Sequence, residues 1–310
     1  MKTLITGVDG FIGGWLADLL VERGDQVFGL TRRVEPPDSG TVRRVHADLR
    51  DELAVSAAVE RARPDRIFHL AALNHIATSF ADPEATFGVN LLGTLHLLRA
   101  VLHHVPHATF VSVGSSAEYG DTTRTRPTVG EDDPLLPTSP YGVSKVAQGL
   151  LCRQAWRSEG LRAIHVRPFA IIGAGKRGDA LSQFAEQVLR VEAGTTTTVR
   201  VGNLEPVRDF VDVRDCVAAL VLVATQGEAG GFYNICHGEP VPLFDIMEAL
   251  RHCARASFDV VEERSQVRAV DDMRIVGDPR KLMGLGYART YRLEDTLRTT
   301  LQWLRADRPA

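Results

Sequence analysis

Short apolar runs rich in β-branched residues recur along the first half of the chain, with stretches of helical periodicity between them. Six of these runs are predicted to be strands, at residues 3–6, 26–30, 42–47, 66–70, 109–113 and 162–166. Strands that alternate with helices form a parallel sheet with right-handed crossovers. Because the runs are continuously apolar rather than alternating, we expect helices to cover both faces of this sheet.

The rhythm changes after about residue 167, where the predicted elements become short and mixed. Turn-forming segments such as GAGKRGD (173–179) and EAGG (228–231) lie between them. We predict a sheet domain over residues 1–167, to which about residues 205–235 return, and a smaller α/β lobe formed mainly by residues 168–310. This lobe is expected at the carboxyl ends of the strands. The tract TTTT (195–198) is interpreted as a strand or a loop.

Composition narrows the classes of protein that the chain can belong to. The 310 residues carry a net charge of -3 without a basic run, so small molecules rather than nucleic acids are the expected partners. No segment approaches the roughly 20 apolar residues that span a bilayer, which argues against membrane insertion. Glycines and an aspartate interrupt the apolar start MKTLITGVDG, so we interpret it as a first strand and the protein as cytoplasmic.

The cysteines and histidines show no metal-binding pattern. No CxxC spacing occurs, and the cysteines are interpreted as buried thiols of a reducing compartment. The segment HHVPH (103–107) has no carboxylate or cysteine at ligand spacing, so no metal site is predicted. The four cysteines are Cys152, Cys216, Cys236 and Cys253.

A glycine-rich turn follows the first predicted strand and precedes an amphipathic helix. Gly7, Gly10 and Gly13 have GxxGxxG spacing, and Phe11 and Ile12 lie between the last two. Glycines at this position let the backbone approach a pyrophosphate, which binds at the helix N-terminus. Tight turns also use glycine, but the strand and helix on either side favour a Rossmann-type dinucleotide-binding domain.

The residues after the next two strands bear on the choice of cofactor. The second strand ends in Arg32 and Arg33, where an acid would bind the ribose 2′-hydroxyl of NAD and an arginine a 2′-phosphate. These arginines favour NADP(H), with NAD(H) still possible, unless both are solvated surface residues. Asp48, followed by Leu49, is a candidate for the adenine, or it caps the next helix.

The fourth strand ends in the small residues of HLAA (69–72). Leu70, Ala71 and Ala72 are expected near the nicotinamide half of the cofactor. His69 is interpreted as a packed core histidine rather than a catalyst.

The segment SPYGVSK (139–145) places Tyr141 and Lys145 one helical turn apart on the same face. A neighbouring ammonium stabilises a phenolate and lowers its pKa, which suits proton transfer at a carbinol or carbonyl. This spacing also occurs in ordinary surface helices. Here it follows, in the right order, the strand with the glycine turn and a strand that ends in the serine-rich FVSVGSS (110–116).

Taken together, these segments resemble the extended short-chain dehydrogenases/reductases that act on nucleotide sugars. Within that group the chain is most similar to GDP-6-deoxy-4-keto-mannose reductases and their GDP-mannose 4,6-dehydratase relatives. The resemblance implies a catalytic set of Ser115, Tyr141 and Lys145, with Pro168 at the cofactor. It rests on the glycine turn, HLAA, NLLGT (90–94), SSAEYG (115–120), SPYGVSK, RPF (167–169), VGNLEPVRDFVDVRD (201–215), YNICHG (233–238) and RAVDDMRIVGDPRKL (268–282).

The segment SSAEYG differs from the dehydratases that the chain resembles. In those enzymes a glutamate two residues before the tyrosine removes the C5 proton, and here this position is Ala117, preceded by Ser116. Glu118 is one residue away, and on a strand it would point to the opposite face. Elimination is therefore not expected, whereas hydride transfer at C4 needs only the elements that are retained.

The resemblance also implies a set of substrate contacts. Arg208 and Arg268 are the candidates for the two phosphates, or they pair with Asp209 and Asp271. Relatives carry an asparagine where this chain has Ala170, and Lys176 or Arg177 is the candidate to replace its phosphate contact. The full set of predicted substrate residues is Asn74, His75, Thr78, Ser116, Ala170, Lys176, Val201, Arg208, Arg268 and Asp271.

The sequence leaves four functions open. The favoured one is NADPH-dependent reduction of the C4 ketone of a GDP-4-keto-6-deoxymannose type sugar, and the second is a C4 epimerase that keeps NAD bound. A 4,6-dehydratase or a non-catalytic cofactor-binding protein is less favoured. By resemblance, a homodimer is expected through the helix near residues 90–102 and the Tyr141 helix.

Overall fold

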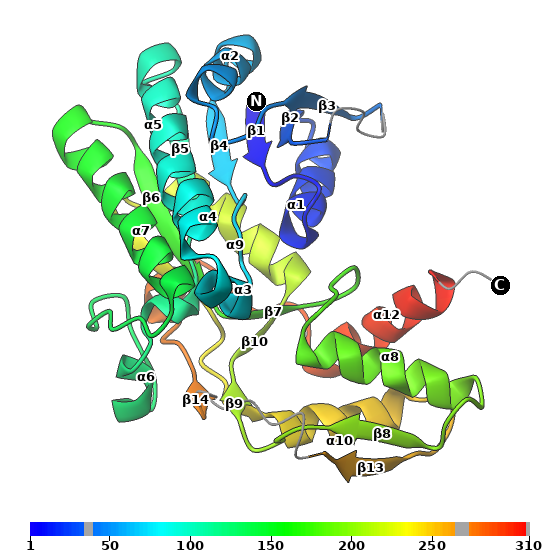
Figure 1. The fold of residues 1–310 in the computed structure, drawn as a ribbon. Helices are drawn as coiled ribbons and strands as arrows, with labels where there is room; N and C mark the ends of the chain where they lie inside the picture. The colour runs from blue at the N-terminus through cyan, green and yellow to red at the C-terminus, as the bar shows by residue number, and fades with distance from the viewer. Residues whose placement is uncertain (34–39, 264–272, 308–310) are drawn as a thin grey trace.

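A seven-stranded sheet, parallel in every pairing, forms the centre of the domain in the upper half of Figure 1. The computed structural model describes residues 1–33, 40–263 and 273–307. All six predicted strands are confirmed, and a seventh, β11, extends the edge at β6. In spatial order the strands are β11 (Phe232–Ile235), β6 (Ala163–Pro168), β5 (Thr109–Val113), β4 (Arg66–His69), β1 (Lys2–Thr6), β2 (Gln26–Thr31) and β3 (Val42–His46).

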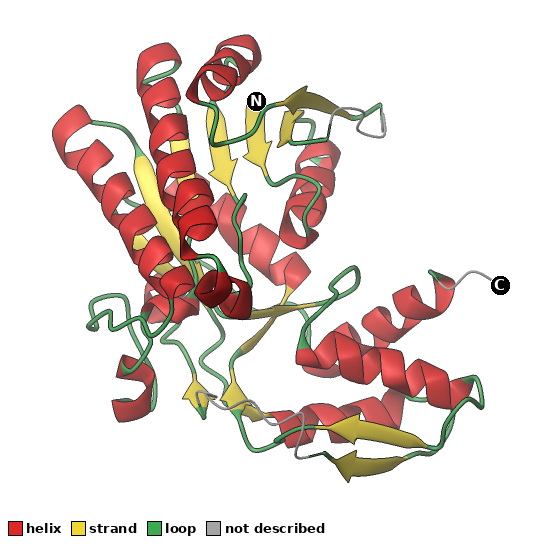
Figure 2. Ribbon diagram, viewed as in Figure 1, coloured by secondary structure: helices red, strands yellow, loops and turns green. Residues whose placement is uncertain are grey.

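Helices cover both faces of this sheet, which confirms the doubly wound α/β fold (Figure 2). Successive side chains of a strand point to opposite faces, so Leu4 packs in one core cluster and Ile5 in the other. This explains why the strands are apolar at every position. One face carries α1 (Phe11–Glu22) and α9 (Val213–Gln226), and the other carries α2 (Glu52–Ala62), α5 (Gly93–His104) and α7 (Pro140–Glu159).

The strand order reverses between β1 and β4, and this reversal creates a crevice at the carboxyl ends of the strands. The glycine turn after β1 and the segment after β4 both open into it. The fold therefore places the residues singled out in the sequence at one edge of the sheet.

A second lobe lies beyond the carboxyl ends of the strands (Figure 1). It has its own apolar core, which includes Val199, Leu250 and Leu301. The TTTT tract is mostly loop, since β8 begins at Thr198. The lobe is built from α8 (Ala180–Glu192), β8 (Thr198–Val201), α10 (Leu243–Cys253), β13 (Asp259–Glu262) and α12 (Leu293–Ala306).

Short elements connect the sheet to this lobe. The strands among them pair as β10-β7 and as β12-β9-β14. They are β7 (Ala170–Ile172), β9 (Val207–Arg208), β10 (Phe210–Asp212), β12 (Val241–Pro242) and β14 (Arg274–Ile275). The remaining short helices of the described chain are α3 (Ile76–Ala81), α4 (Pro83–Phe87), η1 (Gly88–Leu92), η2 (Ser116–Glu118), α6 (Thr122–Thr125) and α11 (Arg280–Met283).

One helical run differs from the expectation that no segment is long and apolar enough to span a bilayer. Elements α4, η1 and α5 form 22 continuous helical residues, Pro83–His104, which are long and apolar enough by length and composition. In the fold this run packs against α2 and α7, and Leu97 and Val101 on it are fully buried. Packing against the sheet domain thus accounts for part of its apolar character.

Candidate active site

Helix α7 carries two of the predicted catalytic side chains at its start. Ser139 caps this helix, since its Oγ accepts a hydrogen bond of 3.1 Å from the N–H of Gly142, and Pro140 occupies the first helical turn. The cap and the proline define where the helix begins. Tyr141 and Lys145 consequently lie one turn apart on its buried side.

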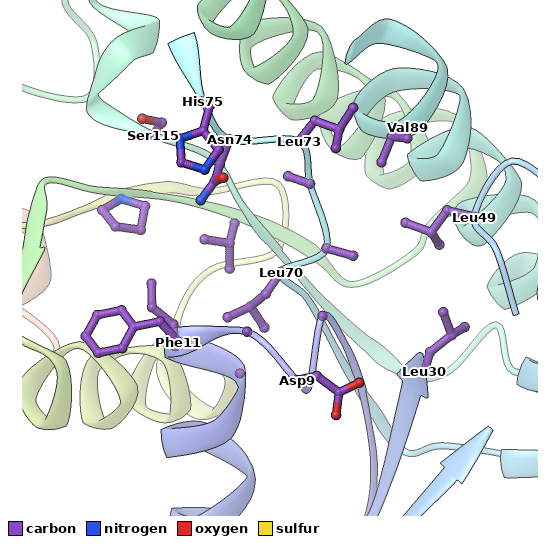
Figure 3. Close-up of a pocket in the computed structure, with 18 of the residues that line it drawn as sticks. Asp9, Phe11, Leu30, Leu49, Leu70, Leu73, Asn74, His75, Val89 and Ser115 are labelled. Atoms are coloured by element: carbon purple, nitrogen blue, oxygen red, sulfur yellow. The ribbon is translucent and has the colours of Figure 1, made fainter. Parts of the chain in front are cut away.

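A cavity of about 610 Å³ lies at the carboxyl ends of the strands (Figure 3). Its volume is in the range of sites that hold cofactors and small substrates. The glycine turn, the segment after β4 and the start of α7 all contribute to its wall. The predicted residues that line it are Gly7, Gly10, Phe11, Ile12, Gly13, Arg32, Arg33, Asp48, Leu49, Leu70, Ala71, Ala72, Asn74, His75, Ser115, Tyr141, Lys145, Pro168 and Lys176.

The glycine turn is shaped for a group that approaches its backbone closely. Gly7 has φ 73°, a left-handed conformation, and a Cβ on Gly13 would lie 2.1 Å from the Gly7 carbonyl oxygen. The first turn of α1 contains no acidic residue, and its N-cap, Gly10, provides no side-chain cap. The N–H groups at this helix end are thus available to an anion, so the turn fits the pyrophosphate of a dinucleotide.

Acidic and basic side chains meet at the end of the cavity where β2 stops. The Asp9 carboxylate accepts hydrogen bonds from Thr31 Oγ1 at 2.6 Å and from Arg44 Nε at 3.2 Å. Arg32 and Arg33 are exposed and line the cavity there. This end could accept a 2′-phosphate through the arginines.

Asp48 lines the same end of the cavity and is paired with Arg50. Its carboxylate accepts a hydrogen bond of 2.7 Å from Arg50 Nη2, and this bonding holds the pKa of Asp48 at about 2. The alternative that Asp48 caps the next helix is wrong, because Asp51 caps α2 by accepting from the N–H of Ala54.

Ser115, Tyr141 and Lys145 meet on the wall of the cavity opposite the glycine turn. The side chain of Ser115 lies near the Tyr141 phenol and acts to lower its pKa. The Ser115 hydroxyl oxygen also accepts from the N–H of Ala117 at 3.1 Å. Lys145 is 2% exposed, and its Nζ lies 5.9 Å from the centroid of the Tyr141 ring. The arrangement can donate a proton to an oxygen atom in the cavity.

The acidity of Tyr141 differs from the sequence-based expectation. The sequence predicts that the neighbouring ammonium lowers the pKa of this phenol. In the structure burial dominates and raises the pKa of Tyr141 to about 12, while the nearby Ser115 side chain acts in the opposite direction. Burial likewise lowers the pKa of Lys145 to about 8.

The interpretation of His69 as a packed core histidine is confirmed. The ring is 1% exposed and hydrogen-bonds Thr6 Oγ1 at 2.7 Å and Thr94 Oγ1 at 2.9 Å. Burial lowers the pKa of His69 to about 3, so the ring is neutral near pH 7.

Glu118 does not line the cavity, but the reason differs from the one that the sequence suggested. The segment is the short helix η2 and not a strand, so alternation of side chains does not apply. Ser115 and Glu118 form a capping box in which the N–H of Ser115 donates to Glu118 Oε1 at 3.0 Å. The carboxylate is fully buried and bonds to His165 and Arg167.

Several predicted substrate residues do not line the cavity among the described parts of the chain. Thr78 is exposed on α3, Ser116 and Ala170 are half-buried, and Arg208 is half-buried on β9. Val201 is a correction, since its side chain is fully buried in the core of the second lobe. Arg268 and Asp271 lie outside the described residues.

The cavity also includes residues that the sequence did not single out. Asp9 belongs to the glycine motif itself, and its place directly before Gly10 was the available signal. Trp15 Nε1 donates to the Ala174 carbonyl at 2.9 Å, which ties α1 to the loop that carries Lys176. The Lys176 ammonium lies 5.6 Å from the centroid of the Phe11 ring, at the start of α1.

Comparison with known proteins agrees with this geometry. The family model described as GDP-mannose 4,6 dehydratase matches residues 4–300. The chain belongs to this family. The family is part of the extended short-chain dehydrogenases/reductases, and the chain is an enzyme of that type. Its cavity fits a nicotinamide dinucleotide.

Two relatives of this chain have different activities. A GDP-6-deoxy-D-mannose reductase of Pseudomonas aeruginosa is 32% identical over 288 residues, 91% of this chain and 89% of the relative. A GDP-6-deoxy-D-talose 4-dehydrogenase of Aggregatibacter actinomycetemcomitans is 28% identical, covering 92% and 91% of the two chains.

Solved structures show the same fold over almost the whole chain. RMD from Pseudomonas aeruginosa in complex with NADPH has a TM-score of 0.86 at 27% identity, with 99% of each chain covered. A UDP-glucose 4-epimerase of Thermus thermophilus in complex with NAD has a TM-score of 0.86 at 29% identity, covering 99% of this chain and 100% of the other.

Proposed function

We propose that this enzyme reduces the C4 ketone of a nucleotide-diphosphate 4-keto-6-deoxysugar with NADPH, the GDP-linked 4-keto-6-deoxymannose type being the preferred substrate. One observation carries this proposal over dehydration. Among the described residues that line the cavity, the carboxylates are Asp9 and Asp48, and both are bonded at the end of the cavity that lies at β2 and β3. The described wall near Tyr141 therefore offers no carboxylate to remove a C5 proton.

NADPH, when bound, supplies the hydride for the ketone carbon. The glycine turn and the N-terminus of α1 would hold its pyrophosphate, and Arg32 and Arg33 its 2′-phosphate. The preference for NADPH over NADH rests on these two arginines and on the likeness to a reductase whose structure contains NADPH. Lys145 would contact the ribose beside the nicotinamide, as the family resemblance implies.

Tyr141 is the proton donor in this proposal. Because its pKa is about 12, the phenol keeps its proton near pH 7 and can give it to the C4 oxygen as negative charge develops there. The Ser115 hydroxyl is held by the N–H of Ala117, which leaves its own hydrogen free to bond the same oxygen. Both groups stabilise the alkoxide more strongly than the ketone.

The diphosphate of the substrate needs cations from the second lobe. Arg208 on β9 is the described candidate, and Arg268 is proposed from the resemblance alone. Asp209 does not need an arginine, because its carboxylate accepts hydrogen bonds from the N–H groups of His237, Gly238 and Gly277. Asn74 and His75 line the cavity and are proposed to contact the sugar.

The proposal is tested by following NADPH oxidation with GDP-, dTDP- and UDP-linked 4-keto-6-deoxysugars. Oxidation with the GDP-linked substrate is expected, together with a single C4 epimer of the deoxysugar product. No oxidation with any of the three would contradict the proposal. Tightly held NAD and interconversion of C4 epimers without added cofactor would instead establish an epimerase, the activity of a structurally similar enzyme.

We also propose that the enzyme is a homodimer. Apolar side chains are exposed on η1 and along α7, namely those of Leu92, Val143, Leu150 and Trp156. A second copy would remove them from water. Light scattering is expected to give the mass of a dimer, and Leu150→Glu is expected to give that of a monomer. A monomeric wild type would overturn this assignment.

A further inference from the structure

A buried chain of hydrogen bonds leads away from the catalytic lysine. Lys145 Nζ donates to Gln148 Oε1 at 2.8 Å, and Gln148 Nε2 donates to Ser112 Oγ at 2.8 Å. Ser112 Oγ lies 3.2 Å from His165 Nδ1, and His165 Nε2 lies 2.9 Å from Glu118 Oε1. All five side chains are at most 2% exposed.

With a neutral His165, the hydrogen bonds of this chain can run in one direction only. The Glu118 carboxylate only accepts, so His165 Nε2 must carry the hydrogen and Nδ1 must accept. Ser112 then donates to Nδ1 while it accepts from Gln148, whose amide oxygen faces the ammonium. Every donor points from the Lys145 cation toward the Glu118 anion.

The other end of this chain returns to the catalytic serine. Glu118 Oε1 accepts from the backbone N–H of Ser115 at 3.0 Å, while Glu118 Oε2 accepts from Arg167 Nε at 2.7 Å. Lys145 is also fixed by the Val113 carbonyl, to which its Nζ donates at 2.8 Å. One network thus holds the backbone of Ser115 and the ammonium of Lys145.

The surrounding backbone is built closely around this network. A Cβ on Gly114 would lie 2.1 Å from Glu118 Oε1 and 2.3 Å from His165 Nε2. A Cβ on Gly149 would lie 3.0 Å from His165 Cδ2. Glycine at these two positions leaves the space that the buried carboxylate and imidazole occupy.

We propose that Glu118, His165 and Gln148 are positioning residues, which hold Ser115 and Lys145 in place and make the Glu118 carboxylate the buried counter-charge of Lys145. In dehydratase relatives an acid near this position takes part in elimination. Here the acid lies one residue later, behind the cavity wall. The inference rests on the proposed function only in that Tyr141 gives up a proton during turnover.

Of the charged and titratable groups named around Lys145, Glu118 carries the negative charge. Burial lowers the pKa values of His69 on β4 and His165 on β6, and it raises the pKa of Cys152 to about 12. These three groups are therefore neutral near pH 7. Tyr141 on the same helix is protonated as well, and Arg167, on the far side of Glu118, is a cation.

The charge on Glu118 acts on both catalytic groups in the same direction. It raises the pKa of Lys145, which burial lowers. It also raises the pKa of Tyr141, which burial raises as well. Reduction requires both groups to be protonated, so activity is lost as the pH rises through these pKa values. Removal of the Glu118 charge should lower both values and move the alkaline limb of the kcat profile to lower pH.

The test compares two variants with opposite expected shifts. Glu118→Gln should move the alkaline limb down by about one pH unit, the smaller end of the effect of a nearby charge. Gln148→Glu places a carboxylate against Lys145 and should move the limb up. The double variant should return toward the wild-type profile.

Asp25→Asn is the matched control, because Asp25 forms a 2.6 Å ion pair with Arg66 at the amino end of the sheet, away from this network. The alkaline limb of the Asp25→Asn profile should stay in place even if this variant is less stable than the wild type. If Glu118→Gln and Gln148→Glu lowered kcat but left the alkaline limb of the pH profile in place, these residues would have a structural role only. That result would overturn the proposal. If Glu118→Gln does not fold, the direction of the Gln148→Glu shift decides.

The outcome can be separated from that of the proposed function. The pH dependence of the NADPH dissociation constant, followed by cofactor fluorescence without any sugar, should show the same opposite shifts, since Lys145 would bind the ribose. Shifts in NADPH binding without ketosugar reduction would support the network and reject the substrate. Ketosugar reduction without any shift in either measurement would reject the network and keep the function.

Discussion

The hydroxyl of Thr31 donates a hydrogen bond of 2.6 Å to the carboxylate of Asp9, which joins the end of β2 to the glycine turn. Arg44 Nε binds the other oxygen of the same carboxylate at 3.2 Å. The negative charge of Asp9 is therefore bonded where a 2′-phosphate would arrive, and Arg32 and Arg33 provide the positive charge for it.

Replacement of both Arg32 and Arg33 by alanine should weaken NADPH binding about 10- to 100-fold, since hydrogen bonds to charged groups contribute about 1.5–3 kcal/mol. NADH lacks the 2′-phosphate, so its dissociation constant should change little. Fluorescence titration with both cofactors measures the two values. Arg298→Ala, an exposed arginine of the second lobe, is the control. Equal losses for NADPH and NADH would contradict this role.

Tyr141→Phe should lower kcat about 100- to 10,000-fold, because it removes the proposed proton donor while keeping the buried ring. The dissociation constant of NADPH should stay within a few-fold of wild type. Tyr287→Phe removes a buried hydroxyl that hydrogen-bonds His237 at 2.9 Å and serves as the control. A Tyr141→Phe enzyme with nearly normal kcat would exclude this tyrosine as the donor.

Trp15→Phe should raise the NADPH dissociation constant about five-fold. The indole N–H donates to the Ala174 carbonyl, and its loss removes a contribution of about 1 kcal/mol to the placement of the loop that carries Lys176. Lys176→Met should have an effect at least as large, because its ammonium lies next to Phe11 at the pyrophosphate end of the cavity. Trp156→Phe, on the outer side of α7, should bind NADPH like the wild type. Wild-type affinity for NADPH in both Trp15→Phe and Lys176→Met would show that this loop does not contribute to NADPH binding.

The stability of the protein should depend on pH through Asp209. Burial raises the pKa of this carboxyl from 3.8 to about 6, although three backbone N–H groups act against the shift. Between these pH values the folded protein holds a proton that the unfolded chain has released. The free energy of unfolding should therefore fall as the pH rises from about 4 to about 6 and then level off.

Urea unfolding of wild type and Asp209→Asn across this pH range measures the effect. The variant lacks the titrating group, so its stability should be flatter with pH. A shift of about two pKa units corresponds to a difference of about 3 kcal/mol over the whole range. Parallel curves for the two proteins would show that Asp209 does not titrate there.

Much of the fold was predictable from local pattern. The six strands of the first half have continuous β-branched sequences, and each boundary lies within two residues of the structure. The seventh strand was not among the predicted ones, although about residues 205–235 were expected to return to the sheet domain, because Phe232–Ile235 is short and its pairing with β6 depends on a chain reversal that α9 provides. Such long-range returns leave little trace in a local window.

In the candidate site, too, local features were predictable from the sequence and long-range contacts were not. The glycine turn, the segment after β4 and the Tyr141–Lys145 pair were readable because each has a fixed spacing, and all of them line one cavity. Glu118 was correctly expected to face away from the site, but for the wrong reason, because a strand was assumed. The signal for the turn was present, since Ser115-x-x-Glu118 has the spacing of a capping box. Its partners His165 and Arg167, on β6, could not be found from spacing.

The position of β11 has a consequence for synthesis of the chain. This strand covers the edge of β6, yet it follows β6 in the chain only after α8 and β8 of the second lobe and helix α9. A nascent polypeptide that has just left the ribosome at Pro168 therefore presents a row of unpaired backbone groups. Shortened chains that stop before Ile235 should accordingly bind chaperones or aggregate instead of folding as a separate nucleotide-binding unit.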